Sequence, residues 1–139
     1  MQNIEIDARG PRFSAALTTV VLAVALVTGS IWVATFQAVF FAIGAINGPQ
    51  FTPYAFIYRT LIKPRLNSPL RTEDVRPPKF AQSIGLLFAL VALAGAATGT
   101  SVIFTVAIAA ALAAAFLNAA FDFCLGCQIY LILFRIRNA

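Results

Sequence analysis

Histidine is absent from this sequence of 139 residues. Its absence excludes Ser-His and Cys-His nucleophile pairs and every metal site that depends on imidazole ligands. Cysteine occurs only twice, at Cys124 and Cys127. Two thiols cannot complete a four-ligand zinc or iron–sulfur site within one chain, although a dimer would supply four. We therefore expect neither a metal nor a cofactor in a single chain.

Charge is also scarce, because only 11% of the residues are charged while 60% are hydrophobic and the mean hydropathy is +0.87. A soluble domain of this size cannot hide that much apolar surface, so lipid must be part of its solvent. In a soluble protein the net charge of +5 would suggest nucleic acid as a partner. Here the charges occur only where hydrophobic runs stop, which indicates membrane topology and not nucleic-acid binding.

Two long stretches, 13–58 and 80–121, carry no charge at all. One membrane crossing needs about 20 apolar residues, so each stretch has room for two crossings and a turn, and residues 28–30 and 98–100 are the expected turns. We therefore predict an all-α membrane protein whose first span is retained and not cleaved as a signal peptide. The four predicted spans are Phe13–Thr28, Ile31–Ile46, Phe80–Ala97 and Ser101–Phe121.

Residues 51–66 differ from the spans, because basic residues interrupt an apolar pattern of helical spacing and Pro53 and Pro64 bound it. The segment is too short and too charged to cross. We predict an amphipathic helix in the membrane interface, with a poorly ordered basic loop as the alternative. Residues 67–79 contain three prolines and five charges and are predicted to form a polar cytoplasmic connector.

The two halves of the chain match one another in an ordered series. The sequence at 9–13 recurs at 76–80, the turn at 28–30 recurs at 98–100, and 51–58 aligns with 123–130. We interpret this as a tandem duplication, in which 1–66 and 80–139 each hold a helical hairpin followed by an amphipathic helix. Because each half would cross the membrane an even number of times, both halves would have the same orientation. An axis roughly along the membrane normal would then relate them.

With four spans, all ten basic residues fall on one side of the membrane, and the two turns on the other side carry none. The positive-inside rule then predicts that both termini, the connector and the cysteine pair are cytoplasmic. A competing model makes 123–134 a fifth crossing, but these 12 residues are too few to span a bilayer.

The Cys-x-x-Cys spacing places two sulfurs on one helix face, where they can form a disulfide, ligate a metal jointly or exchange with a partner's thiols. If the chain breaks near 118–120, Asp122 would be the N-cap of a new helix. Cys124 would then lie in the first turn, where the pKa of a thiol is lowered. If the fourth span instead runs on, the thiols lie mid-helix in apolar surroundings and are less reactive. Inert structural cysteines are the alternative to a redox, persulfide or metal role.

An acid among apolar residues is costly in lipid, which makes Asp122 a functional candidate as well. It could move protons for the thiols or only cap the helix. The candidate catalytic residues are therefore Cys124, Cys127 and Asp122.

Three stretches of this chain carry a family resemblance: residues 7–13, the repeated Arg-Pro-Pro-Lys-Phe at 76–80, and Phe-Cys-Leu-Gly-Cys-Gln-Ile-Tyr at 123–130. They resemble domain-of-unknown-function family 4395 of small bacterial integral membrane proteins, over nearly the whole chain. The resemblance implies a bacterial inner-membrane protein encoded beside thioredoxin-like and rhodanese-like sulfurtransferase proteins. It therefore points to thiol or sulfane-sulfur handling with such a cytosolic partner, but it supplies no established activity. The last stretch is also locally similar to quinone-linked disulfide-forming membrane oxidoreductases, whose extra cysteine pair this chain lacks.

Three functions remain open at this point. The first is a thiol-redox or sulfur-relay protein. The second is a small transporter or channel for a sulfur compound, formed between the two halves of the chain in a protein that is an oligomer. The third is a subunit of a larger membrane complex with no chemistry of its own. The absence of charge within the first three spans argues against a polar path inside one chain.

Overall fold

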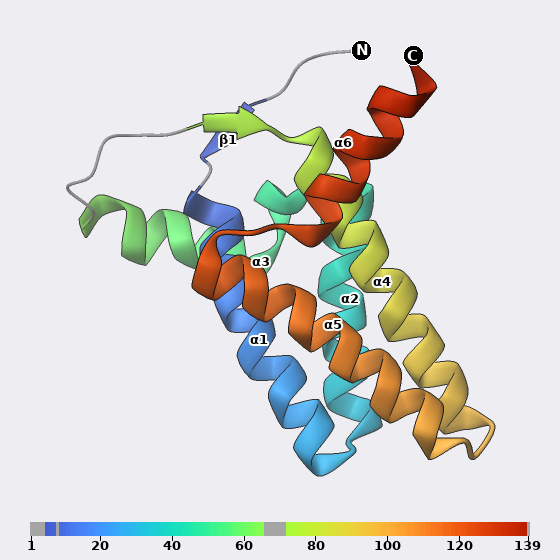
Figure 1. Ribbon diagram of the computed structural model, residues 1–139. Helices are drawn as coiled ribbons and strands as arrows, with labels where there is room; N and C mark the ends of the chain where they lie inside the picture. The colour runs from blue at the N-terminus through green and yellow to red at the C-terminus, as the bar shows by residue number, and fades with distance from the viewer. Residues whose placement is uncertain (1–4, 8, 66–71, 139) are drawn as a thin grey trace.

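A bundle of four long helices forms the body of the protein (Figure 1). The computed structural model describes residues 5–7, 9–65 and 72–138. The bundle helices are α1 (Arg9–Thr28), α2 (Ile31–Ile46), α4 (Arg76–Ala97) and α5 (Ser101–Phe121). By length and apolar composition α1, α4 and α5 are candidate membrane spans, while α2 is a shorter apolar helix. The expected class, a helical membrane protein, is confirmed.

The predicted helix boundaries hold for α2 and α5, whereas α1 and α4 each begin four residues earlier than expected, at Arg9 and Arg76. The earlier start has a local cause. The Asp7 and Asp74 carboxylates accept hydrogen bonds from the backbone N–H of Arg9 and Arg76, at 3.0 and 2.9 Å. These bonds satisfy an amide that has no partner within its helix.

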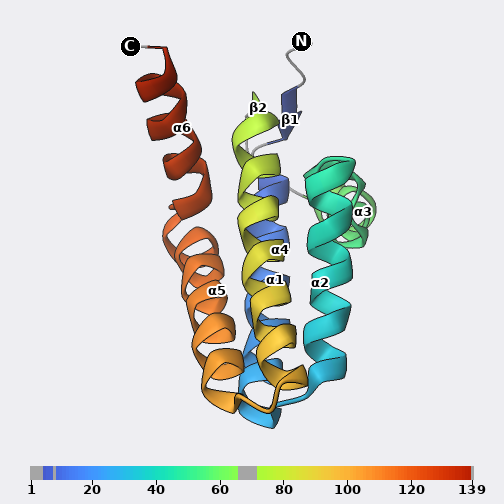
Figure 2. The same ribbon diagram turned by 90° about the vertical axis from the view of Figure 1, so that its right-hand side faces the viewer.

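Both helix–helix turns lie at the end of the bundle opposite the chain termini (Figure 2). Each turn contains a glycine with positive φ, 65° at Gly29 and 80° at Gly99. Glycine adopts this conformation without the steric penalty that a side chain would meet. The turns predicted at 28–30 and 98–100 are therefore confirmed.

The bundle is held together by close approach of small residues. Helix α1 packs against α5, and α2 packs against α4. At the second contact a Cβ on Gly85 would lie 2.6 Å from the Phe41 ring, so the glycine is what admits the ring. Leu22 and Ile108 are fully buried, whereas Val27 and Trp32 are 85% and 79% exposed. Apolar side chains therefore face outward as well as inward, as lipid requires.

Two short strands join the halves of the chain, which the sequence did not predict. Strand β1 (Glu5–Asp7) pairs antiparallel with β2 (Thr72–Asp74), and Ile6 lies opposite Glu73. The second half of the expected connector at 67–79 contains β2 and the first turn of α4. Residues 67–71 of the connector lie outside the described part of the chain. Each strand ends on the Asp whose carboxylate binds the first N–H of the following helix, so both strands lie at the same end of the bundle.

The segment after α2 is helical, as predicted, but irregular. It comprises η1 (Pro49–Phe51), α3 (Pro53–Ile57), the π-turn η2 (Tyr58–Ile62) and η3 (Lys63–Arg65). Figure 1 shows α3 and its continuation running crosswise to the bundle helices and projecting to one side, near the end that carries the termini, and Figure 2 views this segment end-on beside α2. The Tyr54 hydroxyl donates to Oε1 of the buried Gln37 at 2.7 Å, and burial raises the pKa of Tyr54 to about 12. A protonated donor therefore fixes this segment to α2.

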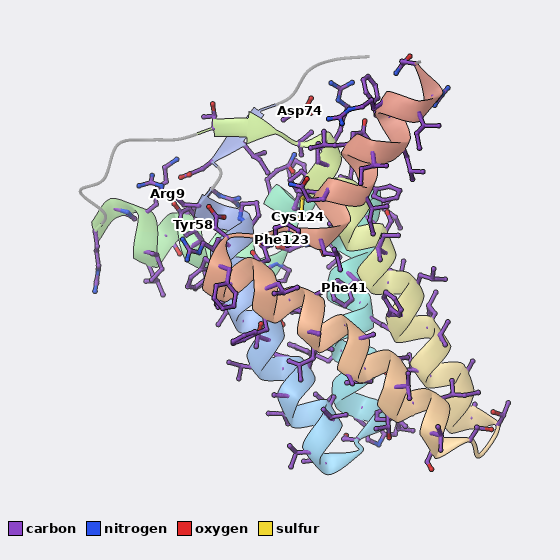
Figure 3. The ribbon with its side chains drawn as sticks, in the orientation of Figure 1. Arg9, Phe41, Tyr58, Asp74, Phe123 and Cys124 are labelled. Atoms are coloured by element: carbon purple, nitrogen blue, oxygen red, sulfur yellow. A yellow bond between two sulfur atoms is a disulfide. The ribbon has the colours of Figure 1, made fainter. Side chains whose placement is uncertain are left out.

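Asp7 anchors the same segment to the start of α1. Its carboxylate accepts from the Arg9 guanidinium at 3.1 Å and from the Tyr58 hydroxyl at 2.8 Å, and it lies 3.7 Å from the Lys63 ammonium. Burial by itself would raise the pKa of Asp7, but the hydrogen bonds from Arg9 and Tyr58 and the charge of Arg9 hold it at about 2. Figure 3 shows Arg9 and Tyr58 converging at this corner.

Asp7→Asn is expected to lower the free energy of unfolding by about 1–2 kcal/mol at pH 7. Because the folded pKa is depressed, this stabilisation is present above about pH 4 and is lost as the pH falls through about 2. Asp74→Asn is the matched control, since Asp74 binds Arg76 in the same way but its side chain is 35% exposed, against 11% for Asp7. Thermal unfolding in detergent across this pH range measures both variants, and equal losses would contradict the prediction.

Candidate functional site

The chain breaks between α5 and α6 (Leu125–Arg137), at residues 122–124. Asp122 has φ 54° and ψ 31°, and its N–H donates to the Asn118 carbonyl at 3.1 Å. The bond from Asp122 to Asn118 is that of an αL cap, and the Phe123 N–H reaches back to the Leu117 carbonyl at 3.2 Å. Asp is one of the few non-glycine residues that tolerate this left-handed conformation. The break therefore comes after 118–120, and Asp122 closes α5 instead of capping α6.

Arg12 holds the end of α5 in place from the neighbouring helix. Its guanidinium donates to the carbonyls of Ala119 and Ala120, at 3.0 and 3.3 Å. Carbonyls in the last turn of a helix lack intrahelical partners and carry the negative end of the helix dipole, so a cation is favourable there. Sequence reasoning used Arg12 only for topology. The available signal was that the start of α1 and the end of α5 had to lie at the same end of a four-span bundle.

Cys124 is the N-cap of α6, and it is bridged to Cys127 by a disulfide. The Cα atoms are 5.1 Å apart, and Sγ of Cys124 accepts the Cys127 N–H at 3.1 Å. Both residues are half-buried. The sequence left two alternatives, a break near 118–120 that places Cys124 in the first turn of a new helix, and an unbroken fourth span. The structure has a break, but at 122–124, so Cys124 is the N-cap of the new helix. When the bridge is open, that position favours the thiolate form of Cys124.

The first turns of α6 pack against the start of α4. A Cβ on Gly126 would lie 2.7 Å from both Cα and Cβ of Ala81, and the Phe80 and Tyr130 ring centroids are 5.6 Å apart. Unlike α3, α6 does not lie across the bundle: both views show it rising away from the turns to the C-terminus (Figures 1 and 2). With 13 residues it is shorter than a span. The packing at Gly126 sets this direction, which no local pattern indicated.

A cavity of about 480 Å³ opens beside the disulfide. Helices α1, α4, α5 and α6 supply most of its wall, and both cysteines and Asp122 lie on it. Figure 3 shows Cys124 at the junction of α6 with the bundle. Most of its lining residues are apolar, and the amide side chains on its wall are those of Gln82, Asn118 and Gln128. The structure thus brings all three predicted site residues to one cavity, which sequence reasoning did not foresee.

The family model of a domain of unknown function, DUF4395, matches residues 6–135 of this chain. The chain belongs to DUF4395. The expected family is thereby confirmed on nearly the full length, and the matched region includes all four bundle helices and the cysteine pair. No curated protein and no solved structure matches this DUF4395 chain.

Few other side chains that could bind a metal or transfer a proton lie at the DUF4395 site. Within residues 5–7, 9–65 and 72–138, no three His, Cys, Asp or Glu residues come together in a way that could hold a metal ion. Asp122 is exposed at the cavity rim, and Asn118 lies one turn before it on α5. The arrangement therefore offers a disulfide, two carboxylates and several amides beside an open cavity.

Proposed function

We propose that this DUF4395 protein is an integral membrane protein that handles thiols or sulfane sulfur through Cys124 and Cys127. The observation that carries the proposal is the bridge at the N-terminus of α6, on the wall of a cavity. A disulfide that closes so short a loop contributes about 2 kcal/mol on the loop-entropy model, at the low end of the range, so a purely structural role explains it poorly. In exchange, Cys124 would attack and Cys127 would resolve the mixed disulfide. Asp122 would pass protons between the thiols and water.

We further propose that α2 is a fourth crossing and that the chain is a tandem duplication. Helix α2 spans about 24 Å and lies against the full-length α4. The strand register favours duplication. With an offset of 67 residues, Glu5 corresponds to Thr72 and Asp7 to Asp74. Each residue pairs with the counterpart of the other, Glu5 with Asp74 and Asp7 with Thr72, as a two-fold relation requires. The Phe13–Tyr58 and Phe80–Tyr130 ring contacts, at 5.8 and 5.6 Å, are a second matching pair. The proposed units remain 1–66 and 80–139, with 67–79 between them.

The proposed orientation has both termini in the cytoplasm of a bacterium. Among the residues that the structure describes, the basic ones occur in the first turns of α1 and α4, in the segment 58–65 and at the end of α6. All of these basic segments lie toward the bundle end that carries the termini (Figure 1). The positive-inside rule then favours a cytoplasmic disulfide and a cytosolic thioredoxin-like or rhodanese-like partner.

A transporter for an anionic sulfur compound is less well supported. Asp74 and Asp122 lie on the cavity wall, and no Lys or Arg from the described ranges does. The wall therefore offers an anion no Lys or Arg side chain of the described ranges to bind. If the protein were a non-catalytic subunit of a larger complex, or of a homo-oligomer, its thiols would be unreactive. Labelling and re-oxidation of the cysteines distinguish this function from thiol exchange.

The test is labelling of Cys124 and Cys127 with a membrane-impermeant maleimide in inverted and right-side-out vesicles, before and after reduction. We expect labelling only after reduction and only from the cytoplasmic side, with Cys124→Ser/Cys127→Ser as the blank. Full-length protein that is reduced and then exposed to glutathione disulfide should re-form its bridge within minutes. Thiols that stay reduced under these conditions, or label only from the outer side, would refute the proposal.

A further inference from the structure

The cavity beside the disulfide is the part of the molecule that thiol exchange alone does not use. Its volume of about 480 Å³ lies in the range of small-molecule sites, which is about 300–1,000 Å³. Phe41, Ile84 and Phe88 contribute apolar wall from α2 and α4, and the disulfide borders the same space. A molecule held in the cavity would therefore contact the sulfurs directly.

The wall also indicates which ligand the cavity suits. Apart from Asp122 and Asp74, whose carboxylate pairs with the Arg76 guanidinium at 2.6 Å, its lining is uncharged, and no Lys or Arg from the described ranges lines it. The amide side chains of Gln82 and Asn118 line it and make no hydrogen bond to any described residue. Each amide can donate to an acceptor on a ligand. The wall thus suits a neutral, mostly apolar molecule that carries hydrogen-bond acceptors.

Electron balance requires an acceptor from outside the chain. A partner dithiol that reduces the bridge leaves two electrons and two protons on Cys124 and Cys127. No other cysteine exists in the chain, and no metal-binding cluster occurs among the described residues. The electrons must therefore leave on a molecule that reaches the sulfurs, and a lipid-soluble acceptor can enter a helical bundle from the bilayer.

We propose that the cavity binds a quinone, with the amides of Gln82 and Asn118 donating to its ring carbonyls. This inference rests on the proposed thiol function. In the step, the two S–H bonds break and the S–S bond forms. The two electrons pass to the quinone ring, and the two protons end on its carbonyl oxygens, which yields the hydroquinone. The oxidised pair then accepts electrons from the next partner dithiol.

Ubiquinone-1 is the probe, because its fully substituted ring cannot form thiol adducts by addition. Full-length protein in nanodiscs is reduced, freed of reductant and mixed with ubiquinone-1 without oxygen. We expect one quinone to be reduced per chain, seen as loss of quinone absorbance, with both free thiols lost in parallel. Ala114→Phe, which fills the cavity from α5, should lower the rate of quinone reduction at least tenfold. Ala113→Phe is the matched control, since Ala113 is exposed on the same helix and does not line the cavity.

Gln82→Leu provides a second variant of similar size in case the phenylalanine disrupts folding. Loss of one hydrogen bond should raise the quinone concentration for half-maximal rate up to about tenfold. Equal quinone rates for Ala114→Phe and Ala113→Phe, with no effect of Gln82→Leu, would overturn the proposed site. Wild-type thiols that react with glutathione disulfide but not with ubiquinone-1 would overturn the quinone inference and leave the thiol function intact. Thiols inert toward both would overturn the proposed function itself.

Discussion

Cys127→Ser is expected to accumulate a mixed disulfide on Cys124, whereas Cys124→Ser should lose thiol exchange almost completely. The reason is the different position of the two sulfurs on α6. Cys124 is the N-cap, where the positive end of the helix dipole and the N–H of residue 127 at 3.1 Å stabilise a thiolate. Cys127 lies one turn further on. Cys124 is therefore the attacking thiol, and Cys127 releases the partner.

The measurement is intact-protein mass spectrometry after the reduced variants have been treated with glutathione disulfide. Cys127→Ser should retain one glutathione, and wild type should retain none because Cys127 expels it. For Cys124→Ser we expect a rate of modification lower by about 100-fold, as for a thiol without helix stabilisation at neutral pH. The double serine variant is the blank. Faster modification of Cys127 than of Cys124 would reverse the assigned roles.

Gly126→Ala should be the most damaging single-methyl change near the site. The added Cβ would lie 2.7 Å from Cα and Cβ of Ala81, and a backbone atom cannot move aside as a flexible side-chain tip can. We expect a loss of about 1–3 kcal/mol in unfolding free energy from overpacking. Because the displaced segment carries Cys127, the rate at which the bridge re-forms should fall as well.

Gly10→Ala is the matched control for this change. Gly10 is also a glycine near the start of a helix, but its added Cβ would be 3.6 Å from the Tyr58 ring, an ordinary van der Waals distance. Thermal unfolding and re-oxidation by glutathione disulfide should separate the two variants clearly. Ala81→Gly, combined with Gly126→Ala, should recover part of the loss because one of the two close contacts disappears. Similar behaviour of both alanine variants would show that α6 does not depend on the contact with α4.

The helices of this protein were largely predictable, and their physical basis is simple. The uncharged runs at 13–58 and 80–121 are each long enough for two helices, and the glycine turns divide them. In lipid, backbone groups must bond within their own helix, so apolar runs of this length leave few alternatives. This is why α2 and α5 have the predicted boundaries. The helical character of 53–65 followed from an equally local pattern, and so did the choice of Cys124 and Cys127 as candidate site residues.

What only the tertiary structure decided depends on contacts between distant residues. Sequence pattern did not indicate that Arg12 would bind carbonyls at the end of α5, more than a hundred residues away. It also did not reveal that Asp122 would close that helix in a left-handed conformation, which leaves Cys124 to cap the next one. The strand pair, the direction of α6 and the cavity arise from how finished helices pack. Periodicity and charge describe how each segment meets lipid or water, but packing depends on which surfaces come into contact once the segments have formed.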